Sequence, residues 1–110
     1  MASYRARATA IHQLVVQVRR LMEQQIDGTP SDKAAVISLA VETSNKLLYC
    51  FMLSQEMFDR IDELLNDHLE VVAEPQRIAS LYVRALDVIR QLEGHAHEWV
   101  VKYAVTSKGA

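Results

Sequence analysis

The residues with the clearest capacity for chemistry are four histidines: His12, His68, His95 and His97. On a helix, Glu93 with His97 and His95 with Glu98 stand at spacings that bring two side chains together. His95 and His97 are two residues apart, so on a helix they point about 200° apart and cannot bind one metal ion. The sequence therefore predicts no metal site, and we expect His95 and His97 to be a solvated pair.

The chain has one cysteine, Cys50, which excludes an internal disulfide. Because Cys50 lies inside the apolar run Leu47–Leu53, we expect a small buried hydrophobe rather than a reactive thiol. The sequence contains no glycine-rich phosphate loop, no nucleophile elbow and no CxxC motif. We therefore predict no catalytic residue and no cofactor, and we expect that the protein is not an enzyme.

The segment Phe58–Leu65 (FDRIDELL) resembles the opening helix of the all-helical chorismate mutases. The resemblance implies an active site in which several basic side chains converge on two substrate carboxylates. The basic residues available from this segment onward, before the C-terminal tail, are Arg60, Arg77, Arg84, Arg90 and Lys102. Pro75 cuts the long helix that the resemblance requires downstream, which makes this enzyme the remotest of three alternatives.

The composition favours packed helices. Half of the 110 residues are apolar, and Leu, Val, Ile and Ala supply most of them. Three glycines and two prolines allow few turns, which argues against a β fold with many hairpins. No apolar run approaches the ~18 residues of a membrane span, and the N-terminal residues lack the apolar core of a signal peptide. We expect a single all-α domain, 1–110, located in the cytoplasm.

Hydrophobic periodicity predicts three main helices, of which the first covers residues 3–26. Its apolar stripe consists of Tyr4, Ala8, Ile11, Val15, Val18 and Met22. In the break that follows, Gly28 can adopt the left-handed conformation that closes a helix. Thr29 can act as the N-cap of the next helix, with Pro30 as its first residue.

The second helix is predicted over residues 30–69 and the third over residues 75–104, with a mobile tail at 105–110. As one helix, residues 30–69 would span about 60 Å, so this segment either breaks or reaches across a second subunit. Its apolar stripe continues through Phe51, Phe58, Ile61 and Leu65. The stripe of the third helix consists of Ile78, Tyr82, Ala85, Ile89, Leu92, Ala96, Trp99 and Tyr103. We expect these two long helices to be antiparallel.

The run Leu47–Leu53 is apolar on every side of a helix, which is more apolar surface than so short a chain is expected to cover. This surplus predicts a homodimeric helical bundle. The residues expected in the dimer core are Phe51, Phe58, Ile61, Ile78, Tyr82, Ile89, Leu92 and Trp99. Those expected to contact another protein are Tyr49, Met52, Leu53, Tyr4, Ile11 and Val15. For Tyr49 and Met52, burial within the homodimer is the alternative.

Charge is unevenly distributed, although the formal net charge is only −2. Up to Ile26 the chain has four arginines and one glutamate, whereas Glu56 to Glu74 has seven carboxylates and one arginine. Such asymmetry can orient a partner or an antiparallel second subunit, and solvated helix faces are the alternative. The arginines of the first helix are too few for a nucleic-acid interface, so we expect no direct nucleic-acid binding and no membrane binding.

Two helix starts carry a further resemblance: Gly28–Asp32 (GTPSD) opens one long helix, and Pro75–Ile78 (PQRI) opens another. From Gly28 onward the chain resembles the small bacterial anti-activators of quorum sensing, the TraM/QslA type. The resemblance implies an all-helical homodimer that binds a LuxR-type transcription factor, at its ligand-binding domain, and keeps that factor from its promoters. The run 47–53 is more apolar, and the first helix longer, than in that family.

A second class of function fits the same features: a helical dimeric chaperone or adaptor for another protein client, such as a secretion or phage component. Co-purification separates the two classes, because the first predicts a LuxR-type regulator and the second a different client.

Overall fold

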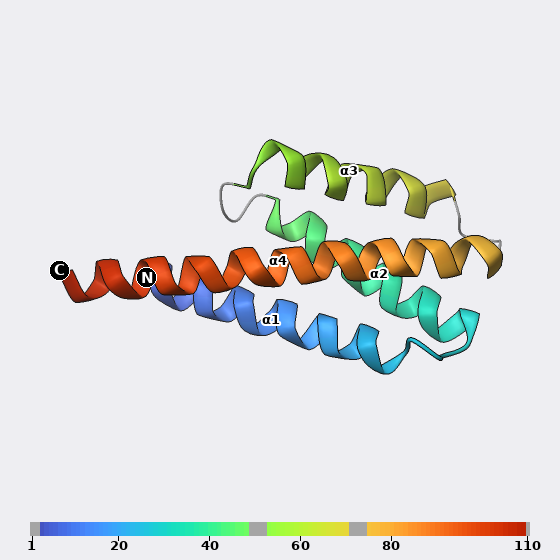
Figure 1. The fold of residues 1–110 in the computed structure, drawn as a ribbon, viewed down its shortest axis with the longest axis horizontal. Coiled ribbons are helices and arrows are strands. Elements are labelled where there is room, and N and C mark those ends of the chain that lie inside the picture. Colours follow the sequence, from blue (N-terminus) through green and yellow to red (C-terminus); the bar gives the residue numbers. More distant parts are fainter. Residues whose placement is uncertain (1–2, 49–52, 71–74, 110) are drawn as a thin grey trace.

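The computed structural model describes residues 3–48, 53–70 and 75–109, and it is helical with no strand in these ranges. Its helices are α1 (Tyr4–Gln24), α2 (Pro30–Leu47), α3 (Gln55–Glu70) and α4 (Pro75–Gly109) (Figure 1). The predicted all-α class is confirmed. The prediction of three main helices is wrong, because the segment 30–69 contains two helices. α4 continues past the end predicted at residue 104.

The junction between α1 and α2 is capped on both sides. Thr29 is the N-cap of α2, and its hydroxyl accepts a hydrogen bond from the Asp32 N–H at 3.1 Å, with Pro30 in the first turn, as predicted. Gly28 does not adopt the predicted left-handed conformation, since no described glycine has a positive φ. α1 is instead closed by Gln25, whose N–H donates to the Leu21 and Met22 carbonyls at 3.2 and 3.1 Å.

The break within the predicted second helix separates α2 from α3. α2 ends at Leu47, and α3 begins after Ser54. The Ser54 hydroxyl accepts a hydrogen bond from the Met57 N–H at 3.2 Å, and the Ser54 carbonyl accepts one from the Phe58 N–H at 3.0 Å. Ser54 is therefore an N-cap that restarts the helix with a new rotational phase. Residues 49–52, and with them Tyr49, Cys50, Phe51 and Met52, lie outside the described residues.

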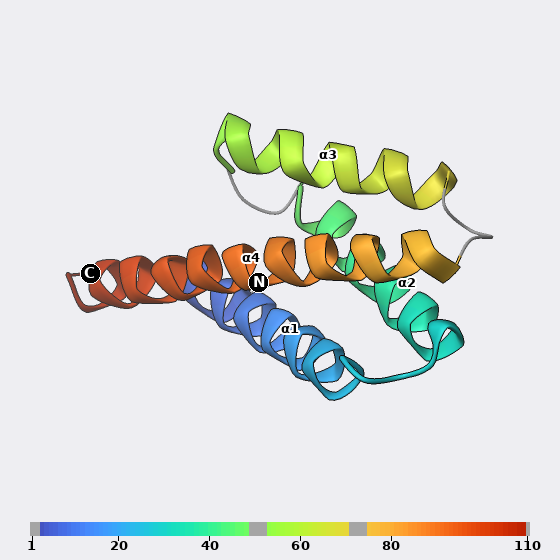
Figure 2. The ribbon, with the colours of Figure 1, turned by 45° about the vertical axis from the view of Figure 1, so that its right-hand side comes forward.

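The helices alternate in direction, so that α1 and α3 run one way and α2 and α4 the other (Figures 1 and 2). α4 has 35 residues, which at about 1.5 Å per residue gives ~52 Å, and the longest extent of the molecule is 52 Å. α2 and α4 each contact all the other helices. Within the described ranges α1 and α3 do not contact each other, so they flank the α2–α4 pair from opposite sides.

The core is formed mainly by α1, α2 and α4. On α4 the predicted stripe is buried at its centre, through Tyr82, Ala85, Ile89, Leu92 and Ala96, and is only partly buried at Ile78 and Trp99. Small side chains contribute to the core as well, since Ala8, Ala40, Ser44 and Ala85 are fully buried. The Ser44 hydroxyl donates to the Ala40 carbonyl at 2.8 Å and is thereby satisfied within its own helix.

α3 buries the predicted stripe only in part, since Ile61 is buried and Leu65 packs against the core but Phe58 does not. Met57, Ile61 and Leu64 are buried, whereas Phe58 is 42% exposed. The predicted stripe ran from Phe51 into Phe58 as if the helix were continuous. Because Ser54 restarts the helix, that register does not carry across the break.

Candidate protein-binding groove

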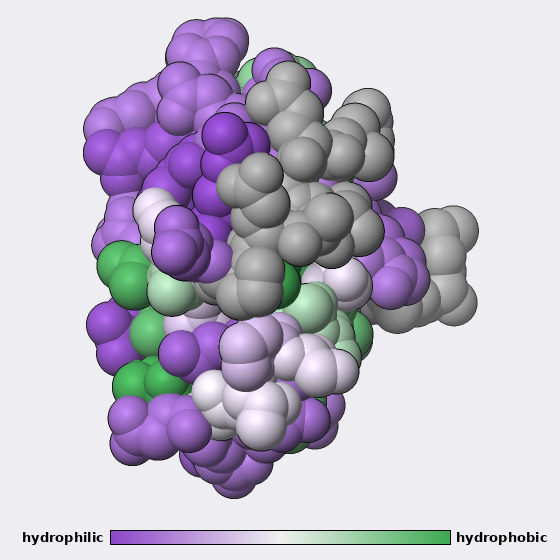
Figure 3. Space-filling model, turned by 90° about the vertical axis from the view of Figure 1, so that its right-hand side faces the viewer, coloured by the Kyte–Doolittle hydropathy of each residue, from purple (hydrophilic) through white to green (hydrophobic). Residues whose placement is uncertain are grey.

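A groove of about 720 Å³ runs along the outer side of α4, at the end of the molecule where α4 begins. It is lined by Ile26, Lys33, Arg60, Glu63, Leu64, Ala79, Tyr82, Val83, Arg84, Leu86, Asp87, Val88 and Arg90. These residues come from α2, α3, α4 and the turn after α1. Figure 3 looks onto this end and shows hydrophobic residues gathered between more hydrophilic side chains above and below them.

The floor of the groove is apolar, with Ala79 and Val83 exposed to solvent and Leu86 buried. Ala79, Val83 and Leu86 are four and three residues apart and therefore lie on one side of α4. Val83 is 68% exposed, and Ile26 is also exposed beside it. Beside the groove, α1 and α3 flank α4 with no contact between their described residues. Apolar side chains gathered in a groove of this kind are typical of a surface that binds a helix of another protein.

Charged side chains form the walls of the groove. Three arginines there are each paired with a carboxylate: Arg60 with Glu56 at 2.7 Å, Arg90 with Glu23 at 3.3 Å, and Arg84 with Asp67. Lys33 has no ion pair with a described residue, and its ammonium lies 5.5 Å from the centre of the Tyr82 ring. The walls therefore carry charge of both signs, which suits a polar rim around an apolar centre.

Tyr82 lies at the base of the groove with a buried hydroxyl. Its side chain is 4% exposed, and the hydroxyl has no hydrogen-bond partner among the described residues. Burial, and then the negative charge of Glu23, raise the pKa of Tyr82 above its ordinary value of 10.0, because both disfavour the phenolate.

Replacing Tyr82 by phenylalanine is expected to stabilise the protein by about 1 kcal/mol at pH 7, because a buried hydroxyl without a partner pays a desolvation penalty. The neutral phenol is favoured in the folded state, so its contribution is intact below the unfolded pKa of 10.0 and is lost as the pH rises above it. Urea unfolding between pH 7 and 11 should show the wild type losing more stability than Y82F. Y4F, at an exposed tyrosine, is the control, and a destabilised Y82F would contradict the prediction.

Polar contacts join α1 to α4 beside the groove. Arg19 forms ion pairs with Glu93 on α4 and with Glu23 on its own helix, the latter at 2.9 Å. The hydrogen bond to Glu93 is the main cause that raises the pKa of Arg19. The rings of His12 and His97 lie 5.8 Å apart between their centres. Among the described residues no group of three or more potential metal ligands is assembled.

The structure places the predicted partner-binding residues in different environments. Tyr49 and Met52 lie outside the described residues. Tyr4 is exposed and stacks on Tyr103 with 5.4 Å between ring centres, while Ile11 and Leu53 pack against the core. Val15 is fully buried within the single chain. The stripe of α1 on which it lies packs on helices of the same chain.

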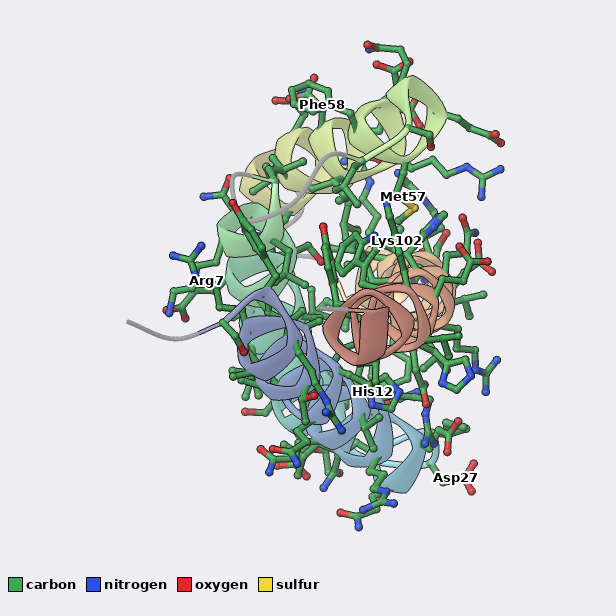
Figure 4. All side chains as sticks on the ribbon, turned by 90° about the vertical axis from the view of Figure 1, so that its left-hand side faces the viewer. Arg7, His12, Asp27, Met57, Phe58 and Lys102 are labelled. Atoms are coloured by element: carbon green, nitrogen blue, oxygen red, sulfur yellow. The ribbon has the colours of Figure 1, made fainter. Side chains whose placement is uncertain are left out.

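The predicted dimer core is largely covered by the single chain. Ile61, Tyr82, Ile89 and Leu92 are buried within the single chain, without a second subunit. Their burial by neighbouring helices follows from the division of segment 30–69, which supplies a fourth helix. Ile78 and Trp99 are partly buried, and Phe51 lies outside the described residues. Among the described members of this set, Phe58 alone is exposed, and Figure 4 shows it on a different side of α3 from Met57.

Three of the basic residues implied by the chorismate mutase resemblance, Arg60, Arg84 and Arg90, do line the groove. Each of them is neutralised by a carboxylate of the same chain. Arg77 and Lys102 are not among the lining residues. The groove thus lacks a cluster of uncompensated cations such as two substrate carboxylates would require.

No described helix combines the length and the apolar character needed to cross a membrane. No protein-family model, no curated protein and no solved structure matches this chain.

Proposed function

We propose that the protein is a non-enzymatic anti-activator that binds a LuxR-type transcription factor through the groove on α4 and keeps it from its promoters. The observation that carries the proposal is the exposed apolar floor at Val83, beside a core that the chain itself completes. Such a surface suits an amphipathic helix, whose apolar residues would cover Ala79, Val83 and Leu86. The LuxR-type identity of the partner comes from the resemblance at the two helix starts.

The mechanism is occlusion. A stable protein interface buries about 800 Å² on each partner, and the groove supplies an apolar centre with a charged rim for such a contact. If the helix seated in the groove belongs to the regulator's own dimerisation surface, the regulator cannot both pair with itself and bind this protein. Promoters then remain unoccupied until the regulator exceeds the amount of anti-activator. The protein acts as a homodimer in the cytoplasm in this proposal.

The experiment is co-purification of the protein with a panel of LuxR-type regulators, with the mass of each complex measured by light scattering. The V83D variant should weaken binding on the order of tenfold or more, because it places a charge on the apolar floor. V101D is the matched control, since Val101 is 51% exposed on the same helix and does not line the groove.

Circular dichroism of both variants should match the wild type. A protein that binds no LuxR-type regulator would overturn the proposal, and recovery of a different client, lost in V83D, would identify the chaperone or adaptor alternative.

A further inference from the structure

We infer that the face formed by α1, α2 and α3, on the opposite side of the molecule from the groove, is the surface through which two copies of the chain associate. The inference builds on the homodimer of the proposed function and names its interface. It depends on four exposed apolar side chains and on opposite charges at the two edges of that face.

The position of these apolar side chains follows from helix geometry, in which each residue turns by about 100°. On α1, Arg19 and Glu23, which each follow a buried residue, contact α4. Leu14 and Leu21 each precede a buried residue and therefore lie on the opposite flank, toward α2. Both are exposed. Figure 4 shows Arg7, seven residues before Leu14, on this same flank, away from α4.

The same reasoning gives the positions of Leu39 on α2 and Phe58 on α3. On α2, Ser38 follows buried Ile37 and meets His68 of α3 at 3.2 Å, so Leu39, which precedes buried Ala40, lies on the flank toward α1. On α3, Arg60 precedes buried Ile61 and hydrogen-bonds to Gln91 of α4. Phe58 follows buried Met57, and Asp62 follows buried Ile61. Phe58 and Asp62 therefore lie on the other flank of α3 from Arg60, toward α2.

Leu14, Leu21, Leu39 and Phe58 are thus half of the eight large apolar side chains that are exposed in the described part of the chain, and they share one face. α1, the longest helix of this face, has 21 residues and is about 32 Å long, and the second longest extent of the molecule is 27 Å. The face therefore has room for the ~800 Å² per subunit that a stable dimer buries.

Charge complementarity selects a second copy as the occupant. Along the α1 edge of the face lies Arg20, and along the α3 edge lie Asp59 and Asp62, all exposed. Neither Arg20 nor Asp62 forms an ion pair with a described residue. A twofold axis parallel to the helices places the basic α1 edge of one copy over the acidic α3 edge of the other, twice in each dimer.

The two edges are also in register. Arg19 of α1 reaches Glu93 and Arg60 of α3 reaches Gln91, so these parts of α1 and α3 lie at similar heights along α4. The same axis therefore brings Phe58 close to Leu21 of the partner subunit and Asp62 close to Arg20 of the partner subunit. Apolar contact at the centre and ion pairs at the edges would then form together.

The test is the mass of the full chain in solution, measured by sedimentation over a range of concentrations. The wild type should approach twice its 12.5 kDa, and L21E should dissociate at least about tenfold more readily. V101D should associate like the wild type. A wild type that stays monomeric at about 100 μM, or an L21E variant that associates as well as the wild type, would overturn the inference.

A charge-swap pair makes the test independent of any loss of folding. R20E alone and D62R alone should each self-associate more weakly, because like charges then meet at both edges. Mixing the two variants should restore a dimer, since each edge again pairs opposite charges. Failure of the mixture to restore association would overturn the inference. If the dimer interface is rejected in this way, regulator binding that is lost in V83D but kept in L21E would still support the proposed function.

Discussion

Replacing Ile89 by alanine is expected to lower the free energy of unfolding by about 2–5 kcal/mol. Ile89 is fully buried on α4, in the cluster to which all four helices contribute, and alanine would leave a cavity that these helices can only partly close. A domain of this size has a total stability of about 5–15 kcal/mol, so a substantial fraction would be lost.

Urea denaturation followed by circular dichroism measures this change. V83A is the matched control, because Val83 lies on the same helix but is exposed, and its effect should stay within about 0.5 kcal/mol. Equal losses in the two variants would contradict the packing of α4 described above.

The neighbouring residues Met57 and Phe58 should respond in opposite ways to truncation. M57A is expected to cost about 2–5 kcal/mol of folding stability, because the Met57 side chain is buried between α3 and the rest of the core. F58A should cost less than about 1 kcal/mol, because the larger Phe58 side chain is exposed in the folded monomer. Size alone would predict the reverse order.

Both variants are compared by urea denaturation at low protein concentration, where self-association does not contribute. F58A should instead weaken association at high concentration, if Phe58 contributes to the proposed dimer face. A larger folding loss for F58A than for M57A would show that α3 packs with the rotational phase predicted from the sequence pattern.

The sequence predicts helices well where one hydrophobic period runs unbroken. On α4 the stripe from Tyr82 to Ala96 is buried as predicted, because nothing interrupts its spacing of four and three residues. The start of α2 is confirmed for a local reason, since the hydroxyl of Thr29 and the ring of Pro30 act within one turn. Both features depend on residues close together in the chain.

The break between α2 and α3 is harder to predict from the sequence than the start of α2. No Gly or Pro marks it, and the surrounding residues are apolar, so the hydrophobic pattern continues while the helix does not. The available signal was Ser54, three residues before Met57, which is an N-cap spacing. A hydrophobic pattern read as continuous through Ser54 gives α3 a different rotational phase and places Phe58 in the core.

The groove could be predicted only in part. Ala79, Val83 and Leu86 form a short apolar pattern beside the main stripe of α4, and this pattern can be found in the sequence. Its exposure depends on α1 and α3 staying apart over α4, which is a tertiary property. The burial of Val15 has the same origin, because the sequence shows that α1 is amphipathic but not which surface it covers.

The separation of α1 from α3 also determines how the molecule can open. Among the described residues, α3 contacts α2 and α4 but not α1, so unfolding of α3 would leave the contacts of α1 with those two helices in place. Amide hydrogens of α3 are therefore free to exchange with solvent by a partial unfolding event that spares the remaining three helices. Protection against exchange should increase from α3 toward the middle of α4. The order of the local stabilities should therefore follow which helices contact each other.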